Sequence, residues 1–145
     1  VNGFKNCMCS EKKLAKALAR MTYAFSNATC AKVNMITGEA YGSAYVFMNS
    51  KSIGADLVYA WNDAKIGTMD STMAAKIMYP DADAAEIKEK ASEYEKLQSS
   101  ATSAAARGYV DRIIEPADSR KYLVAAFEML YTKYVGEPEK KHGTK

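Results

Sequence analysis

Segments of helical and of extended periodicity alternate along this chain of 145 residues, and the alternation restricts its fold more than any other feature. Apolar residues three and four positions apart predict an amphipathic helix over about residues 10–28. A β-branched run predicts a short strand over 32–37. The other predicted helices cover about residues 43–51, 71–79, 82–98, 101–107 and 118–135, and the other predicted strands cover 55–61, 65–69 and 109–114. This order predicts an α/β domain, with Leu123 and Phe127 on the apolar face of its last helix.

The composition is that of an ordinary globular domain. The chain is 48% hydrophobic and 26% charged, which excludes a disordered or fibrous chain. No run approaches the roughly 20 apolar residues that a membrane helix needs, so we expect no span. The first residues lack the charged and apolar segments of a signal peptide. The net charge of +3 is too small to indicate nucleic-acid binding.

The cysteines indicate neither a disulfide framework nor a metal site. Cys7, Cys9 and Cys30 form an odd and sparse set. The Cys7-x-Cys9 pair lacks the second pair of ligands that zinc needs, and the single histidine, His142, lies in a polar tail. We therefore expect no bound metal, and reduced thiols in a cytoplasmic protein.

The segment from Thr37 to Tyr45 is the main candidate for chemistry. It is predicted to run from a strand through a loop and into a helix at Gly42 and Ser43. Backbone N–H groups at such a helix start can bind an anion or a developing oxyanion, and glycine lets a ligand approach closely. The same pattern also fits a glycine that merely packs the helix tightly. Tyr41 and Tyr45 beside the loop either line a pocket or belong to the core.

Several separated runs carry a family likeness. They are ATCAKV at 28–33, AYGSAY at 40–45, AAARGYVD at 104–111, IIEP at 113–116 and FEML at 127–130. Together and in this order they resemble the carboxyltransferase subunits of biotin-dependent acyl-CoA carboxylases and decarboxylases, which carry similar "ATVPKI" and "AYGGAY" stretches. The resemblance extends over nearly the whole chain.

The resemblance implies a fold, a domain organisation and partners. The family has a crotonase/ClpP-like superhelix of ββα turns, with two such domains in a much longer chain. Residues 1–135 are similar to the C-terminal portion of the second domain, and 136–145 form a polar C-terminal tail. We therefore expect a fragment that is inactive alone, whose full-length form is a homo-oligomer. The implied partners are a biotin carboxyl carrier protein and a biotin carboxylase subunit or decarboxylase partners, with no nucleic acid.

The resemblance also implies the site residues. In the family, the second domain holds biotin from its carrier protein, and backbone N–H groups stabilise the enolates formed from the acyl-CoA substrate. The implied catalytic donors are the backbone N–H groups of Gly42, Ser43 and Cys7. The implied cofactor-binding residues are Gly3, Phe4, Lys5, Asn6, Tyr41, Ala44 and Tyr45. Lys5-Asn6-Cys7 stands where the family has Leu-Pro-Gly, and Ser43 stands in place of a second glycine.

Three functions follow from these observations. The first is transfer of a carboxyl group between carboxybiotin and a short acyl-CoA of the propionyl or methylmalonyl type. The second is a non-catalytic role in assembly or in docking the carrier. The third is a crotonase-type hydratase, which places carboxylates near its oxyanion loop. Residues 42–55 contain no Asp or Glu, and this argues against the hydratase.

Overall fold

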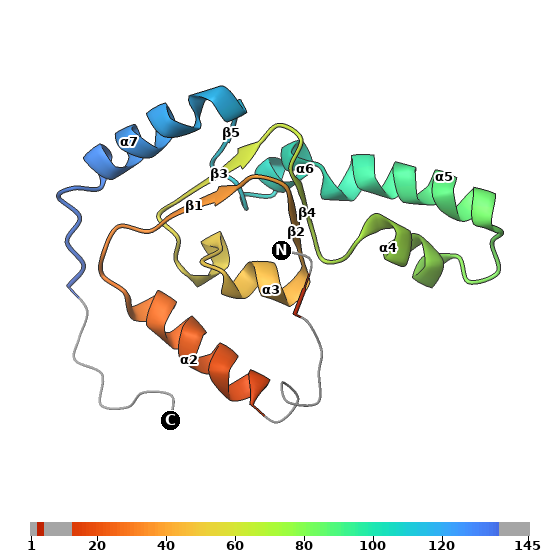
Figure 1. The fold of residues 1–145 in the computed structure, drawn as a ribbon, viewed down its shortest axis with the longest axis horizontal. Coiled ribbons are helices and arrows are strands. Elements are labelled where there is room, and N and C mark those ends of the chain that lie inside the picture. Colours follow the sequence, from red (N-terminus) through yellow and green to blue (C-terminus); the bar gives the residue numbers. More distant parts are fainter. Residues whose placement is uncertain (1–2, 5–12, 137–145) are drawn as a thin grey trace.

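The computed structural model describes residues 3–4 and 13–136. The elements follow in the order α2 (Leu14–Asn27), β1 (Val33–Ile36), β2 (Glu39–Tyr41), α3 (Gly42–Phe47), β3 (Leu57–Trp61), β4 (Lys65–Gly67), α4 (Ser71–Met78), α5 (Ala84–Tyr94), α6 (Ala101–Ala106), β5 (Arg112–Ile114) and α7 (Ser119–Met129). Two small sheets form the centre, with α7 on one side and α2 and α3 on the other (Figure 1). Among the described residues, no helix is long and apolar enough to cross a membrane.

All strand pairs in the two sheets are parallel. Strands β1, β3 and β5 form one sheet in that order, and β2 pairs with β4 in the other. The chain passes from the first sheet to the second between β1 and β2, and again between β3 and β4, and each time a helix follows. Parallel neighbours require such crossovers. The structure thus contains two successive ββα turns, which confirms the α/β prediction and the crotonase-like fold.

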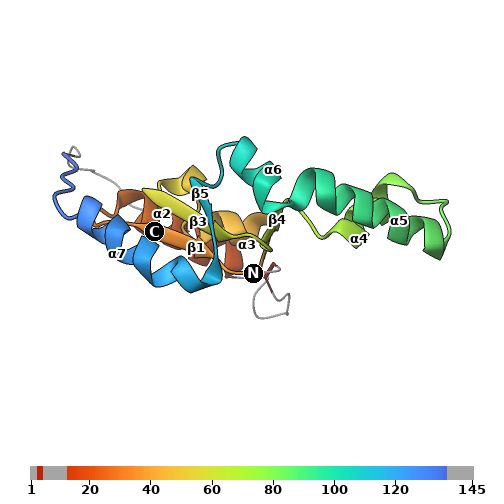
Figure 2. The ribbon, with the colours of Figure 1, turned by 90° about the horizontal axis from the view of Figure 1, so that it is seen from above.

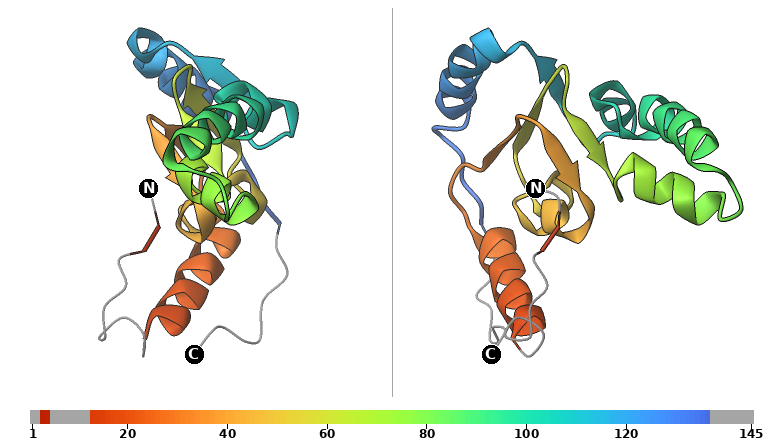
Figure 3. Two further views of the ribbon diagram at one scale, coloured as in Figure 1. Left: turned by 90° about the vertical axis from the view of Figure 1, so that its right-hand side faces the viewer. Right: turned by 45° about the vertical axis from the view of Figure 1, so that its right-hand side comes forward.

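Helices α4 and α5 form an arm that projects from the sheets (Figures 1 and 2). The two helices pack against each other, and the arm meets the body where the π-helix Glu95–Ser99 contacts β4 and α6. The right-hand view of Figure 3 also shows the arm apart from α2. The arm's position is therefore set by this π-helix and by the short connection from β4 to α4.

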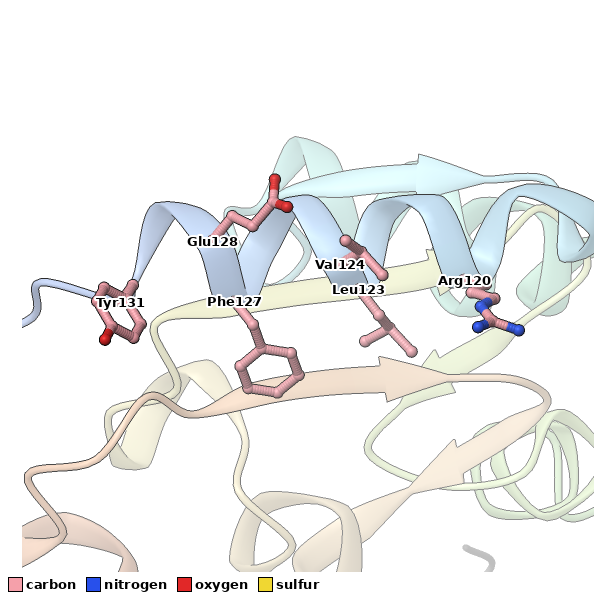
Figure 4. Close-up of a pocket in the computed structure, with 6 residues that line it drawn as sticks. All are labelled: Arg120, Leu123, Val124, Phe127, Glu128 and Tyr131. Carbon is pink, nitrogen blue, oxygen red and sulfur yellow. The ribbon is translucent and has the colours of Figure 1, made fainter.

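The structure differs from the sequence-based expectations in several places. Residues 39–41, expected in a loop, form strand β2, because β4 supplies a hydrogen-bonding partner that lies far along the chain. Helix α3 ends at Phe47, and α7 ends at Met129 instead of near residue 135. Leu123 and Phe127 share one face of α7 as predicted (Figure 4), but this is not the face that packs most closely on the sheet. The helix packs through Tyr122 and Ala126 against Tyr59 and Ile114 of the first sheet, and Phe127 stays half exposed.

A partly buried ion pair connects the segment after α7 to the body. Lys133 Nζ lies 2.8 Å from Asp56 Oδ2 and also donates to the carbonyl oxygen of Cys30 at 3.0 Å. The same Asp56 oxygen accepts the backbone N–H of Lys32 at 2.7 Å. Burial alone would raise the pKa of Asp56, but the hydrogen bonds and charges of Lys133 and Lys32 outweigh burial and lower it.

Helix α4 begins at a side-chain cap whose removal has a measurable cost. Asp70 Oδ2 accepts the backbone N–H groups of Thr72 and Met73, at 2.9 and 3.2 Å. Asp70→Ala leaves both donors without this acceptor, so we expect the free energy of unfolding to fall by about 1 kcal/mol in urea denaturation. Asp81→Ala is the control, because Asp81 is exposed between α4 and α5. Equal losses in the two variants would show that the cap adds nothing.

Candidate active site

The turn from β2 into α3 has a backbone that only glycine adopts easily. Gly42 has φ of +65°, and a Cβ atom there would lie 3.2 Å from the carbonyl oxygen of Thr68. Tyr41 is the N-cap residue in extended conformation. The first N–H groups of any helix have no acceptor within the helix, so Gly42 and Ser43 present backbone donors beside Thr68. Close packing against Thr68 therefore accounts for glycine at this turn, and the helix start leaves Gly42 and Ser43 as candidate donors.

A cavity of about 500 Å³, here named the Gly42 cavity, opens on one side of this turn. Its walls come from α3, β4, the α5–α6 region and the segment after α6. It is lined by Gly42, Ser43, Tyr45, Val46, Ser52, Ile66, Gly67, Thr68, Tyr94, Gln98, Ala104, Arg107 and Tyr109. Among the described residues, none that lines this cavity is a carboxylate. The cavity therefore combines mainly apolar walls with backbone donors, hydroxyl groups and one guanidinium group.

A second hollow, here named the Tyr41 hollow, lies on the other side of the same turn. It has a volume of about 320 Å³ and is lined by Gly3, Glu39, Tyr41, Gly42, Ser43, Thr68, Met69, Asp70 and Met73. Gly42, Ser43 and Thr68 line both spaces, so they form the partition between them. In the part of the chain that the structure describes, no group of three or more His, Cys, Asp and Glu side chains could hold a metal ion.

The two tyrosines beside the turn are neutral phenols at neutral pH. Burial, and after it the charge of Glu39, raises the pKa of Tyr41 to about 12. Burial and Tyr109 raise the pKa of Tyr45. The Tyr45 hydroxyl is buried and has no hydrogen-bond partner among the described residues. Both groups therefore suit hydrogen-bond donation, and neither suits the role of a general base.

The structure brings together part of the set of sequence-predicted residues. Gly3 joins Tyr41, Gly42 and Ser43 at the Tyr41 hollow, and Tyr45 lines the Gly42 cavity. The Phe4 ring packs against Phe47 of α3, with centroids 6.4 Å apart. Ala44 is fully buried. Lys5, Asn6 and Cys7 lie outside the described residues.

Sequence reasoning missed the residues that α5, the π-helix and α6 bring to the Gly42 cavity. The most polar of these are Gln98 and Arg107, whose side chains are hydrogen-bonded to each other. No local pattern distinguishes a π-helix from the end of an α-helix. The sequence therefore gave no sign that Gln98 and Arg107 would lie together. Thr68 could have been found from the sequence, because it follows strand β4 and the carboxyl ends of parallel strands commonly border ligand sites.

The fold and this site together define the class of protein. The chain belongs to the family of the carboxyl transferase domain, whose pattern matches residues 1–144.

Relatives within this family act on acyl-CoA thioesters, as their names state. The chain is 47% identical over 131 residues to the methylmalonyl-CoA decarboxylase subunit alpha of Propionigenium modestum, covering 86% of this chain and 25% of that one. It is 42% identical over 134 residues to the propionyl-CoA carboxylase, carboxyltransferase subunit, of Haloferax mediterranei, with 86% and 25% covered. The chain thus spans about a quarter of the length of the curated relatives it matches.

A solved structure shares this fold closely. The transcarboxylase 12S structure, determined with methylmalonyl-coenzyme A and methylmalonic acid bound, superposes with a TM-score of 0.91 at 39% identity. The similarity covers 99% of this chain and 28% of that one. The expected resemblance to carboxyltransferase subunits is therefore confirmed.

Proposed function

We propose that this chain forms part of the active site of a biotin-dependent carboxyltransferase. The reaction moves a carboxyl group between carboxybiotin and a short acyl-CoA of the propionyl or methylmalonyl type. The observation that carries the proposal is the Gly42 cavity, where the Gly42–Ser43 turn borders a mainly apolar space without lining carboxylates. The acyl-CoA names of the relatives support the substrate class. We assign residues 1–135 to the C-terminal portion of the domain and 136–145 to a tail.

The residues of the Gly42 cavity fit biotin. Its bicyclic ring is apolar apart from one ureido group, and the cavity pairs apolar side chains such as Val46 and Ile66 with polar groups near Gly42. When bound through its carrier protein, biotin supplies the carboxyl group on a ring nitrogen. Tyr45, whose buried hydroxyl has no partner among the described residues, would donate a hydrogen bond to the ring. Gly3 and Tyr41 would border the entrance on the other side of the turn.

Backbone donors perform the electrostatic part of the mechanism. The N–H groups of Gly42 and Ser43, with that of Cys7, would stabilise negative charge as it develops on an oxygen. Preorganised donors in a space without bulk water stabilise such charge far better than water does. Since Tyr41 and Tyr45 remain protonated, rate enhancement comes from these donors and from holding the two reactants together.

The second candidate is a non-catalytic subunit that serves assembly or docks the biotin carboxyl carrier protein. The exposed arm of α4 and α5 favours it, because Met73 and Ile77 on α4 are more than half exposed at 58% and 65%. In either case we expect a homo-oligomer with a biotin carboxylase subunit or decarboxylase partners. A hydratase would need carboxylates beside its oxyanion donors. The described lining residues of the Gly42 cavity provide none, and Glu39 and Asp70 border only the Tyr41 hollow on the other side of the turn.

Carboxyl transfer from carboxybiotin to a panel of short acyl-CoA thioesters tests the proposal. The chain alone is compared with a longer protein that adds the upstream residues its relatives possess. We expect transfer only in the longer protein, because the chain spans about a quarter of its relatives' length. The preferred thioester then defines the substrate. If neither protein transfers a carboxyl group while the biotinylated carrier still binds, the docking role replaces the catalytic one.

A further inference from the structure

A single charged side chain borders the Gly42 cavity in the part of the chain that the structure describes. Of the described residues that line the cavity, only Arg107 carries a charge. The other lining residues offer apolar surface, hydroxyl groups, one side-chain amide and the backbone donors of the turn. Arginine side chains in proteins are always protonated, and they have five N–H donors and no acceptor. Because Arg107 is also exposed, its positive charge lies at the opening of the cavity.

The hydrogen-bond partner of Arg107 is a neutral amide. Arg107 Nη2 donates to Gln98 Oε1, and no ion pair engages Arg107 within the described ranges 3–4 and 13–136. Lys65, by contrast, pairs with the carboxylate of Glu95 at 2.9 Å. An amide occupies only some of the guanidinium donors and compensates none of its charge. Arg107 therefore keeps both charge and donors for an anion.

Two contacts fix the position of Gln98. The carbonyl oxygen of Leu97, the residue before it, accepts the Ser103 hydroxyl of α6 at 2.8 Å. Ser99, the residue after it, is fully buried. Gln98 thus lies between two anchored neighbours in the π-helix, a conformation that often occurs at functional sites. Its hydrogen bond limits the directions in which the Arg107 guanidinium can point.

We propose that Arg107 binds the carboxylate of carboxybiotin, so that the Gly42 cavity prefers the carboxylated cofactor to plain biotin. Gln98 is the positioning residue that orients the guanidinium. The inference rests on the proposed function, because it takes biotin as the occupant of the cavity. A guanidinium binds a carboxylate through two parallel N–H···O hydrogen bonds. Plain biotin has no carboxylate on its ring, so it is held less tightly once the carboxyl group has been transferred.

The preference follows from which groups contact which part of the cofactor. The backbone donors of the turn and the Tyr45 hydroxyl face a bicyclic ring that both forms share, so they contribute to the binding of both. The negative charge on the ring nitrogen is present in carboxybiotin alone. Among the described lining residues, Arg107 is the cation that can detect this charge.

Equilibrium binding of free carboxybiotin and of free biotin to the longer carboxyltransferase tests the inference, in mildly alkaline buffer without acyl-CoA. We expect Arg107→Gln to raise the dissociation constant of carboxybiotin about tenfold or more, and that of biotin less than about twofold. Arg107→Lys keeps the charge and loses the paired donors, so it should restore binding in part. Arg20→Gln is the control and should change neither constant, because Arg20 is exposed on α2 and lies outside the cavity.

Variants at Gln98 test its positioning role with the same two probes. Gln98→Glu gives the Arg107 guanidinium a carboxylate partner inside the cavity. It should therefore weaken carboxybiotin binding as much as Arg107→Gln does. Gln98→Leu removes the hydrogen bond and keeps the charge of Arg107 free, so the dissociation constant of carboxybiotin should rise only about threefold. Biotin binding should stay near its original value in both variants, and circular dichroism verifies the fold of each.

The outcomes separate this inference from the proposed function. Carboxybiotin binding that survives Arg107→Gln overturns the inference alone, and is the result expected if a carboxylate from the remaining length of the protein pairs with Arg107. Equal losses for both probes also overturn it, because Arg107 then only supports the shape of the cavity. An unmodified protein that binds carboxybiotin and transfers no carboxyl group overturns the proposed function alone. A protein that binds neither probe overturns both.

Discussion

Gly42→Val in the longer carboxyltransferase should lower kcat for carboxyl transfer about 100-fold or more, the usual cost of losing an oxyanion donor. Valine is disfavoured at the φ of +65° that Gly42 adopts. Its Cβ atom would also lie 3.2 Å from the carbonyl oxygen of Thr68, so the backbone must shift where the donors are presented. The effect should appear in kcat, because the donors act on charge that develops during the reaction. Steady-state kinetics with propionyl-CoA measure it.

Gly54→Val is the matched control for this experiment. Gly54 also has a positive φ, of 97°, and lies outside both the Gly42 cavity and the Tyr41 hollow. A Cβ atom there would meet only the flexible end of Lys32, at 3.3 Å. Both variants therefore bear similar backbone strain, and only Gly42→Val should lose activity while circular dichroism reports a folded protein. Activity that survives Gly42→Val would count against the oxyanion role.

Asp56→Ala should produce the largest loss of stability, about 2 kcal/mol in urea denaturation, because it leaves donors without their acceptor. The Asp56 and Lys133 side chains are only 20% and 15% exposed. Removing the carboxylate leaves the Lys133 ammonium and the Lys32 N–H without their shared acceptor. Glu93→Ala, which breaks the exposed pair with Lys90, is the comparison and should cost far less. If both variants lose the same free energy of unfolding, the Asp56–Lys133 pair stabilises the fold no more than the exposed Glu93–Lys90 pair does.

The stabilisation from Asp56 should also depend on pH. Its pKa is lower in the folded chain than in the unfolded chain, so the folded state gains stability when the carboxyl is ionised. This contribution is fully present above the unfolded pKa of about 4 and is lost as the pH falls through the lower folded value. The stability difference between the unmodified chain and Asp56→Ala should therefore narrow in acid. A difference that stays constant from neutral pH to acid would contradict this assignment.

Local patterns predicted the parts of the fold that depend on neighbouring residues. The cap at Asp70, the turn at Gly42 and the helix over α2 all follow from adjacent side chains and glycine's freedom. Strand β2 did not, because three residues become a strand only when β4 lies beside them. The face of α7 that packs was also missed, since its most apolar side chains are those the sheet leaves uncovered.

The candidate site also has one part that the sequence indicated and one part that it did not. Its donors come from one short stretch, so the sequence could indicate them. Its far wall comes from the π-helix and α6, where Gln98 and Arg107 meet through a tertiary hydrogen bond. The position of this wall depends on the tertiary arrangement of the π-helix and α6 relative to the sheet. Neither hydrophobic periodicity nor helix propensity predicts that arrangement.

The base of the arm formed by α4 and α5 is part of the wall of the Gly42 cavity. The arm joins the body at two points, the connection after Gly67 and the π-helix, and residues at both points line the cavity. The wall that holds Thr68 and Gln98 is therefore also the base of the arm, and a different orientation of the arm would give the cavity beside Gly42 a different shape.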